Sequence, residues 1–286
     1  PLSSRPTYTE TENDLTVKAN KRTFIFSKKD GQLKGVSVDN RKISFANGPR
    51  FIGARRADRS LDQFYNHDDE KAKEKDRTYS EFPDAAVFTK LDVKQDGGDL
   101  IVTANYKLGN LDKAQWTINP SGDWALDYTY NFSGVVDLMG IRFDYPEDQV
   151  ISKRWLGAGP YRVWQNRIHG TQYDVWENDY NDPIPGETFT YPEFKGYFGN
   201  VSWMNIQTKE GTISLTNETP DAYIGVYQPR DGRDRLLYTL PESGISVLNV
   251  IPPVRNKVNS TDLCGPSSQP KWVNGPQTGR VIFRFM

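Results

Sequence analysis

The chain has 286 residues, with 36 Lys and Arg against 37 Asp and Glu, and therefore a formal net charge of −1. This balance gives no long-range attraction for nucleic acid or an anionic membrane surface, and no apolar run approaches the roughly 20 residues of a membrane-spanning helix. One cysteine, Cys264, excludes an internal disulfide and a cysteine-based metal cluster, and two histidines exclude a three-histidine site.

The composition favours a β protein. Aromatic residues make up 13% of the chain, which also contains 23 Gly and 18 Pro, as expected for many short strands joined by turns. Aromatic side chains can stack on the apolar faces of sugars, and they can equally fill the core of a large sandwich. Both uses remain open from composition alone.

The first third of the chain reads as short strands separated by turns. The Asp-Gly pair at Asp30-Gly31 predicts a hairpin because glycine accepts a positive φ, and Asp96-Gly97-Gly98 repeats the signal. The predicted strands around these turns are Leu15–Val17, Thr23–Ser27, Leu33–Val38, Lys42–Phe45, Phe88–Lys94 and Leu100–Lys107.

The clearest strand follows a predicted turn at Pro120–Asp123. From Trp124 to Asn131 large apolar residues alternate with smaller or polar ones, and this period of two indicates a strand. Further strands are predicted at Gln115–Ile118, Tyr197–Ile206, Thr212–Thr216, Ala222–Tyr227 and Val281–Phe285.

Helical signals are sparse. The segment at about residues 61–77 is highly charged and has almost no apolar face, so we expect a solvated loop or a short helix there. Nothing clearly divides the sequence. We therefore expect one domain over residues 1–286, with an extended N-terminal lead at about residues 1–11.

Two neighbouring segments carry candidate chemistry. Residues 154–167 combine a tight Gly157-Ala158-Gly159-Pro160 turn with arginines and tryptophans that suit sugar hydroxyls and sugar rings. Residues 170–186 hold Asp174, Glu177, Asp179 and Asp182 within nine positions. For these acids we favour a solvated loop over a Ca²⁺ site, because the EF-hand spacing is absent, while a glycosidase carboxylate pair stays open.

The sequence also resembles a known family, the C-terminal β-supersandwich (small-chain) domain of family 2 glycoside hydrolases of the β-galactosidase type. The resemblance spans nearly the whole chain, and its most specific part is the Gly-x-Gly-Pro turn. The segments that carry it are Phe26–Leu33, Gly48–Phe51, Arg154–Pro160, Tyr191-Pro192 and Val247–Val250.

The resemblance implies an all-β, twisted two-layer antiparallel supersandwich of the galactose mutarotase type. It also implies that the catalytic glutamates lie in a separate TIM barrel of the parent protein, and that the parent is a bacterial protein that degrades polysaccharides, in the periplasm or outside the cell. Val247 stands near the position of a sugar-contacting tryptophan in the relatives, and Arg162-Val163-Trp164 replace their acidic segment, whereas Arg167 is retained.

These inferences predict a carbohydrate-facing accessory domain that binds an oligosaccharide or glycan and carries no catalytic residue, metal or cofactor. The expected sugar contacts are Arg162, Trp164, Arg167, Trp176 and Glu177. In the competing interpretation, both tryptophans pack inward and the arginines pair with surface aspartates.

Two other functions stay open at this stage. A free-standing mutarotase-like aldose epimerase would need a general acid and a general base, and His169 with Asp174 or Glu177 is the pairing that the sequence offers. A structural interaction module also fits the composition.

Overall fold

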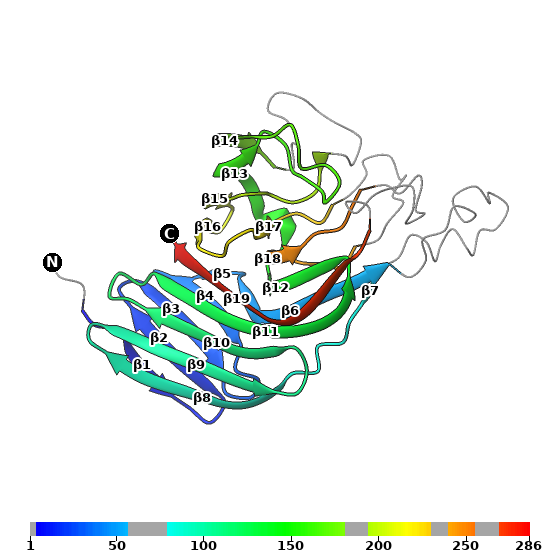
Figure 1. Ribbon diagram of the computed structural model, residues 1–286. Helices are drawn as coiled ribbons and strands as arrows, with labels where there is room; N and C mark the ends of the chain where they lie inside the picture. The colour runs from blue at the N-terminus through cyan, green and yellow to red at the C-terminus, as the bar shows by residue number, and fades with distance from the viewer. Residues whose placement is uncertain (1–3, 57–78, 181–193, 230–239, 255–268) are drawn as a thin grey trace.

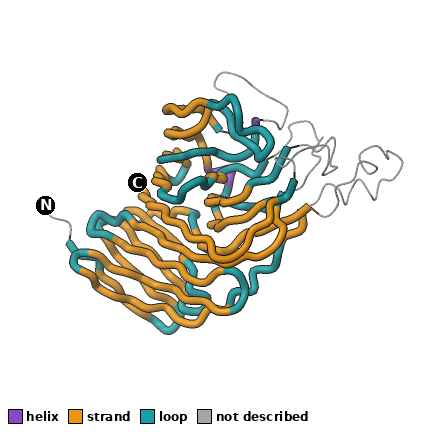
Figure 2. Tube along the Cα trace, in the orientation of Figure 1, coloured by secondary structure: helices purple, strands orange, loops and turns teal. Residues whose placement is uncertain are grey.

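In the computed structural model of the chain, the described residues are 4–56, 79–180, 194–229, 240–254 and 269–286. Strands account for most of them, and Figure 2 shows how little other regular structure is present in this part of the chain. The described helix is a single 3-10 turn, η1 (Glu147–Gln149). None of the described residues forms a helix with the length and apolar character needed to cross a membrane.

Within the described residues, the strands form two sheets (Figure 1). The larger sheet has ten strands in the order β1-β2-β3-β4-β6-β12-β18-β17, with β5 beside β4 and β7 beside β6. Its strands are β1 (Thr7–Glu10), β2 (Asp14–Ala19), β3 (Arg22–Ser27), β4 (Leu33–Val38), β5 (Arg41–Ile43), β6 (Ala46–Arg56), β7 (Tyr79–Glu81), β12 (Leu138–Asp144), β17 (Tyr223–Gly225) and β18 (Ile245–Val250).

The second sheet has nine strands in the order β14-β13-β15-β16-β19-β11-β10-β9-β8. Its strands are β8 (Val87–Asp96), β9 (Asp99–Lys107), β10 (Leu111–Ile118), β11 (Trp124–Val136), β13 (Val150–Gly159), β14 (Gln172–Asp179), β15 (Trp203–Thr208), β16 (Gly211–Asn217) and β19 (Lys271–Phe285). The pairings of β11 with β19 and of β6 with β12 are antiparallel. The predicted all-β, two-layer antiparallel fold is therefore confirmed.

The main core lies between the two sheets and is rich in aromatic rings. Trp124 is 1% exposed, and its ring lies 4.8 Å from that of Phe283 and 6.4 Å from that of Phe24, measured between centroids. The period of two over β11 places alternate side chains in this core, as predicted from the sequence. The composition argument that many of the aromatics fill the core holds for these rings.

A second, smaller cluster lies on the opposite face of the ten-stranded sheet, and we call it the outer-face cluster. In β6, Phe51 belongs to the main core whereas Ile52 belongs to the outer-face cluster, as the alternation of a strand requires. The cluster covers the outer face of β6, β12 and β18. Its buried members are Ile52, Ala54, Tyr79, Leu138, Val163, Trp164, Tyr197, Leu240, Leu248, Ile251 and Val254.

Both predicted Asp-Gly turns are present. Gly31 has a φ of +73°, and a Cβ there would lie 2.6 Å from the ring of Phe88, so both its conformation and its packing require glycine. Gly97 has a φ of +56° in the turn between β8 and β9. Part of the expected extended lead, Thr7–Glu10, forms β1 at the edge of the larger sheet.

Two parts of the sequence behave differently from the prediction. The acidic segment expected as a loop contains β14, an eight-residue edge strand whose side chains are mostly exposed. The sequence therefore lacks the alternation of apolar and polar residues that would predict a strand there. The predicted last strand is part of the fifteen-residue β19, whose Gly275, Pro276 and Gly279 weakened the strand signal. The charged segment at residues 61–77 lies outside the described residues.

The buried tyrosines predict a loss of stability at alkaline pH. Burial raises the pKa of Tyr128 to about 12, and it raises the pKa of Tyr106, Tyr130, Tyr145 and Tyr197 further above the usual value. The folded state therefore holds protons that the unfolded state releases above about pH 10. The contribution of these tyrosines to folding stability is complete below that pH and is lost as the pH rises.

Each such tyrosine removes up to about 1.4 kcal/mol of unfolding free energy per pH unit in that range. Urea unfolding at about pH 8 and about pH 11 measures the effect, with tyrosinate absorbance followed in parallel. Equal unfolding midpoints at the two pH values would contradict the prediction.

Candidate functional site

One cavity among the described residues is a polar cleft of about 760 Å³, which we call the arginine cleft. It lies where β6 and β18 begin and β12 ends, and its volume is in the range typical of small-molecule sites. The residues that line it are Ser44, Ala46, Asn47, Arg50, Glu81, Arg142, Asp144, Tyr145, Pro146, Glu147, Val226, Gln228, Glu242, Ser243 and Gly244.

Two arginines from neighbouring strands define the cleft. Arg50 of β6 and Arg142 of β12 are register partners, so both side chains leave the same, outer face of the sheet. Arg50 pairs with Asp144 and donates from Nε to the carbonyl of Asn47 at 2.8 Å. Arg142 pairs with Glu81 at 3.3 Å and donates to the carbonyl of Glu242 at 2.5 Å. These bonds hold the guanidinium planes in fixed positions.

Ser44 and Tyr145, which line the cleft, bond to one carboxylate. The carboxylate of Glu210 accepts from the Ser44 backbone N–H at 2.9 Å and hydroxyl at 2.5 Å, and from the Tyr145 hydroxyl at 3.1 Å. Burial raises the pKa of the Tyr145 phenol, which therefore remains a neutral donor. Glu147 also lines the cleft, and it accepts from the Tyr180 hydroxyl at 2.7 Å and the Gln228 backbone N–H at 2.9 Å.

The cleft thus combines fixed donors and acceptors. Its charged lining residues are Arg50, Arg142, Glu81, Asp144, Glu147 and Glu242. Guanidinium groups donate to sugar hydroxyls, and carboxylates accept from them, so this mixture suits a ligand with many hydroxyl groups. Among the described residues, no group of three or more His, Cys, Asp and Glu side chains is arranged to hold a metal ion.

The two most N-terminal of the residues predicted to contact sugar are buried. The guanidinium of Arg162 lies 4.9 Å from the ring centroid of Tyr227 and 6.0 Å from that of Phe198. This burial lowers the pKa of Arg162 to about 10. Because the folded state then releases this proton before the unfolded state does, Arg162 offsets part of the loss of folding stability that the tyrosines cause at alkaline pH. Trp164 is 2% exposed in the outer-face cluster, where its ring meets that of Tyr197 edge-on at 5.8 Å.

Arg167 is exposed on the loop that follows Trp164. The backbones of these two residues bond to one another, from Arg167 N to the Trp164 carbonyl at 2.9 Å and in return at 3.5 Å. Between them, the Asn166 side chain forms a reciprocal pair with the backbone of Val254, with both bonds at 2.9 Å. The loop is therefore fastened onto the segment that follows β18.

Trp176 and Glu177 lie on β14, beside β13. The half-buried Trp176 donates from its indole N–H to the carbonyls of Gly157 and Gln172, each at 3.2 Å. A Cβ on Gly159 would lie 2.4 Å from the Trp176 ring, so this ring accounts for one glycine of the Gly-x-Gly-Pro turn. Glu177 is exposed and lies 3.8 Å from the Arg154 guanidinium, a weak surface pair.

The structure therefore separates the five predicted residues into a buried pair, Arg162 and Trp164, and a more accessible group of Arg167, Trp176 and Glu177. Their contact with sugar stays a prediction. The alternation of β14 directs Asp174 to one face and Glu177 and Asp179 to the other, while Asp182 lies outside the described residues.

Sequence reasoning missed the arginine cleft. Arg50 stands in Gly48–Phe51, one of the segments that carry the family resemblance. A Cβ on Gly48 would lie 2.4 Å from the Phe143 ring, so close packing explains the glycine at this position. Arg142 and Glu242 carry no local signal, because they are 100 residues apart and the sheet brings them together. His169 is exposed and does not line the cleft. Val247, at the position of the relatives' tryptophan, is 2% exposed in the main core.

These features define an all-β domain of two antiparallel sheets with a polar cleft on the outer side of the larger sheet. The model of the β-galactosidase small chain family matches residues 18–255. The chain belongs to this family, as the resemblance in the sequence predicted.

Solved structures with a similar course of the chain include aldose epimerases. Galactose 1-epimerase from Lactobacillus acidophilus NCFM is 10% identical with a TM-score of 0.48, and the alignment covers 99% of each chain. A GalM/aldose epimerase homologue from C. elegans is 7% identical with a TM-score of 0.45, covering 98% of this chain and 99% of that one. No curated protein matches the sequence.

Proposed function

We propose that the chain is the carbohydrate-facing accessory domain of a family 2 glycoside hydrolase of the β-galactosidase type. In this proposal the parent protein acts in glycan breakdown, and a catalytic TIM-barrel domain outside this sequence performs the hydrolysis. The observation that carries the proposal is the match of residues 18–255 to the β-galactosidase small chain, which makes a separate hydrolytic domain the natural partner.

The arginine cleft supports this proposal by its chemistry. Arg50 and Arg142 present fixed donors, and Asp144 and Glu81 present acceptors beside them. Hydroxyl groups of a sugar can complete both sets of hydrogen bonds without bringing a charge into the cleft. The exposed group of Arg167, Trp176 and Glu177 is the second proposed contact surface, and the same experiment compares the two.

The first test is the binding of galactobiose to the chain by ligand-observed NMR. We expect a dissociation constant near 1 mM, about −4 kcal/mol, for one small polar site. Arg50→Gln should weaken binding at least about tenfold, because it removes a charged donor that a shorter neutral side chain does not replace. Arg280→Gln is the matched control, since Arg280 also pairs with an aspartate, Asp127 at 2.5 Å, and does not line the cleft.

Two outcomes would count against the cleft. Binding that persists in Arg50→Gln but is lost in Arg167→Ala or Trp176→Ala would show that the sugar contacts the Arg167 loop and β14 instead. Equal loss in Arg50→Gln and Arg280→Gln would show a general effect on the fold, and the thermal unfolding midpoint of each variant identifies that case.

The isolated chain should also be catalytically silent. We expect no hydrolysis of nitrophenyl galactosides and no acceleration of galactose mutarotation, because the proposal places the catalytic carboxylates in another domain. Hydrolysis above a heat-treated control that survives repurification would contradict this. Mutarotation that His169→Ala abolishes would instead favour the aldose epimerase alternative.

A further inference from the structure

A second polar cavity adjoins the arginine cleft. Its volume is about 320 Å³, and Asn47 lines both cavities. From Asn47 it extends over β4, β3 and β2 toward the β1 edge of the larger sheet. Its lining residues are Asn13, Asp14, Ser27, Lys29, Asp30, Gln32, Lys34 and Asn47.

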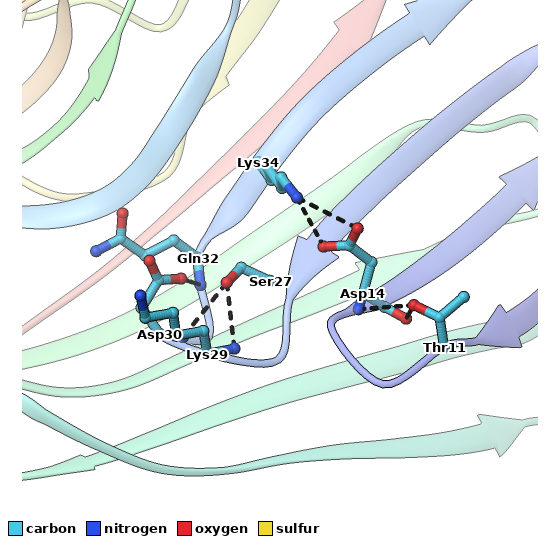
Figure 3. A network of polar contacts seen from close by, with 7 residues as sticks. All are labelled: Thr11, Asp14, Ser27, Lys29, Asp30, Gln32 and Lys34. Carbon is cyan, nitrogen blue, oxygen red and sulfur yellow. Dashed lines mark hydrogen bonds and ion pairs between the residues drawn. The ribbon is translucent and has the colours of Figure 1, made fainter.

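Hydrogen bonds and an ion pair connect the polar groups that line this second cavity (Figure 3). Lys34 contacts both carboxylate oxygens of Asp14, at 3.0 and 3.2 Å. Across the turn, the Ser27 hydroxyl accepts from the Lys29 backbone N–H at 3.2 Å, and the Asp30 carboxylate accepts from that of Gln32 at 3.1 Å. The lining side chains therefore bond to one another and to the backbone of the turn between β3 and β4.

The two cavities lie along one line across the strands. Asp14 is the register partner of Ser27, Leu33 is that of Gly48, and Asp144 is that of Ala46. The lining residues thus follow the sheet order β2-β3-β4-β6-β12-β18 near the strand ends. Five steps between neighbouring strands, at about 4.8 Å each, give the line a length of about 24 Å.

The charges along this line argue against a polyanionic ligand. The lysines and arginines are Lys29, Lys34, Arg50 and Arg142, whereas the carboxylates are Asp14, Asp30, Glu81, Asp144, Glu147 and Glu242. Carboxylates outnumber cations, and the cations at Lys34, Arg50 and Arg142 are paired with them. A chain of uronic acids would meet net repulsion here, whereas neutral hydroxyl groups find both donors and acceptors.

We propose that the two cavities form one continuous groove for a neutral oligosaccharide, which lies across the strands and passes over Asn47. This inference rests on the proposed function and adds the length, direction and charge of the ligand. Because one pyranose ring advances a chain by roughly one strand spacing, the groove accommodates about four to five sugar residues. The ligand is therefore a polymer segment rather than a mono- or disaccharide.

The experiment measures the binding of β-1,4-linked galactose oligosaccharides, from monosaccharide to tetrasaccharide, to the full chain by calorimetry or NMR. We expect the tetrasaccharide to bind at least about tenfold more tightly than the disaccharide, because only the longer chain reaches both cavities. Tetragalacturonate should bind more weakly than the neutral tetrasaccharide, with a difference that added salt reduces.

The decisive variant is Lys34→Met, which keeps the side-chain stem and removes the ammonium from the second cavity. It should weaken the binding of the tetrasaccharide about tenfold and leave the affinity for the disaccharide unchanged. Lys21→Met is the matched control, because Lys21 pairs with Asp39 at 3.5 Å on the surface and lines neither cavity. Both lysines are largely exposed, so neither change should unfold the protein.

The outcomes separate this inference from the proposed function. Equal affinity for disaccharide and tetrasaccharide, unaffected by Lys34→Met, would overturn the groove and leave a single sugar site in the arginine cleft. Tighter binding of tetragalacturonate than of the neutral tetrasaccharide would overturn the neutral ligand. Absence of binding by every oligosaccharide would overturn the proposed carbohydrate-facing function itself.

Discussion

Replacement of Trp124 by alanine is expected to destabilise the domain by about 3–5 kcal/mol and to lower the melting temperature by roughly 10 °C. The indole is 1% exposed and packs against rings from both sheets, including Phe143 of β12 in the larger sheet and Phe283 of β19 in the second. Its loss would leave a cavity at the point where the two layers meet. That cost is a large share of the stability of an ordinary domain.

Urea unfolding of Trp124→Ala, compared with Trp272→Ala, measures this effect. Trp272 is 71% exposed on β19, so its replacement should change the unfolding free energy by no more than about 0.5 kcal/mol. If Trp124→Ala does not fold, the milder Trp124→Phe should still be clearly less stable than the parent. Similar values for Trp124→Ala and Trp272→Ala would contradict the core described above.

The second large effect is expected at Gly159. A Cβ at this position would lie 2.4–2.6 Å from three atoms of the Trp176 indole, so Gly159→Ala should cost about 1–3 kcal/mol through overpacking. Trp176→Ala removes the obstructing ring. In that background Gly159→Ala should be close to neutral, which gives a coupling energy between the two sites of similar size.

A double-mutant cycle by thermal or urea unfolding provides the measurement. Additive effects of Gly159→Ala and Trp176→Ala would show that the indole does not cover the glycine in solution. Sugar titrations of Trp176→Ala then tell whether the ring also contacts a ligand. The cycle thus separates the packing role of Trp176 from its predicted role in binding.

The fold class was predictable because burial on one face of a strand leaves a period of two in the sequence. Trp124, Leu126, Tyr128 and Tyr130 show this pattern, and all four are buried in the main core. By contrast, β14 lies at a sheet edge with its side chains mostly in water, so its composition resembled that of a loop. Edge strands of this kind carry little hydrophobic signal.

The proposed binding surface was harder to predict because it is assembled from distant parts of the chain. The arginines and tryptophans at residues 162–176 are close in sequence and predicted a sugar-contacting group, yet Arg162 and Trp164 are buried. The arginine cleft instead joins Arg50, Arg142 and Glu242, each of which is unremarkable beside its sequence neighbours. Only the register of β6 with β12 places the two guanidinium groups together.

The position of β19 has a consequence for synthesis of the protein. This strand lies between β16 and β11 and pairs with β11 along thirteen residues, from Trp124↔Phe283 to Val136↔Lys271. As the ribosome proceeds from the N-terminus, β8 to β11 and β13 to β16 emerge as two separate halves whose facing edges stay open until residues 271–285 are made. The nine-stranded sheet therefore closes late, and a nascent chain halted before that point would expose two long unpaired edges to aggregation.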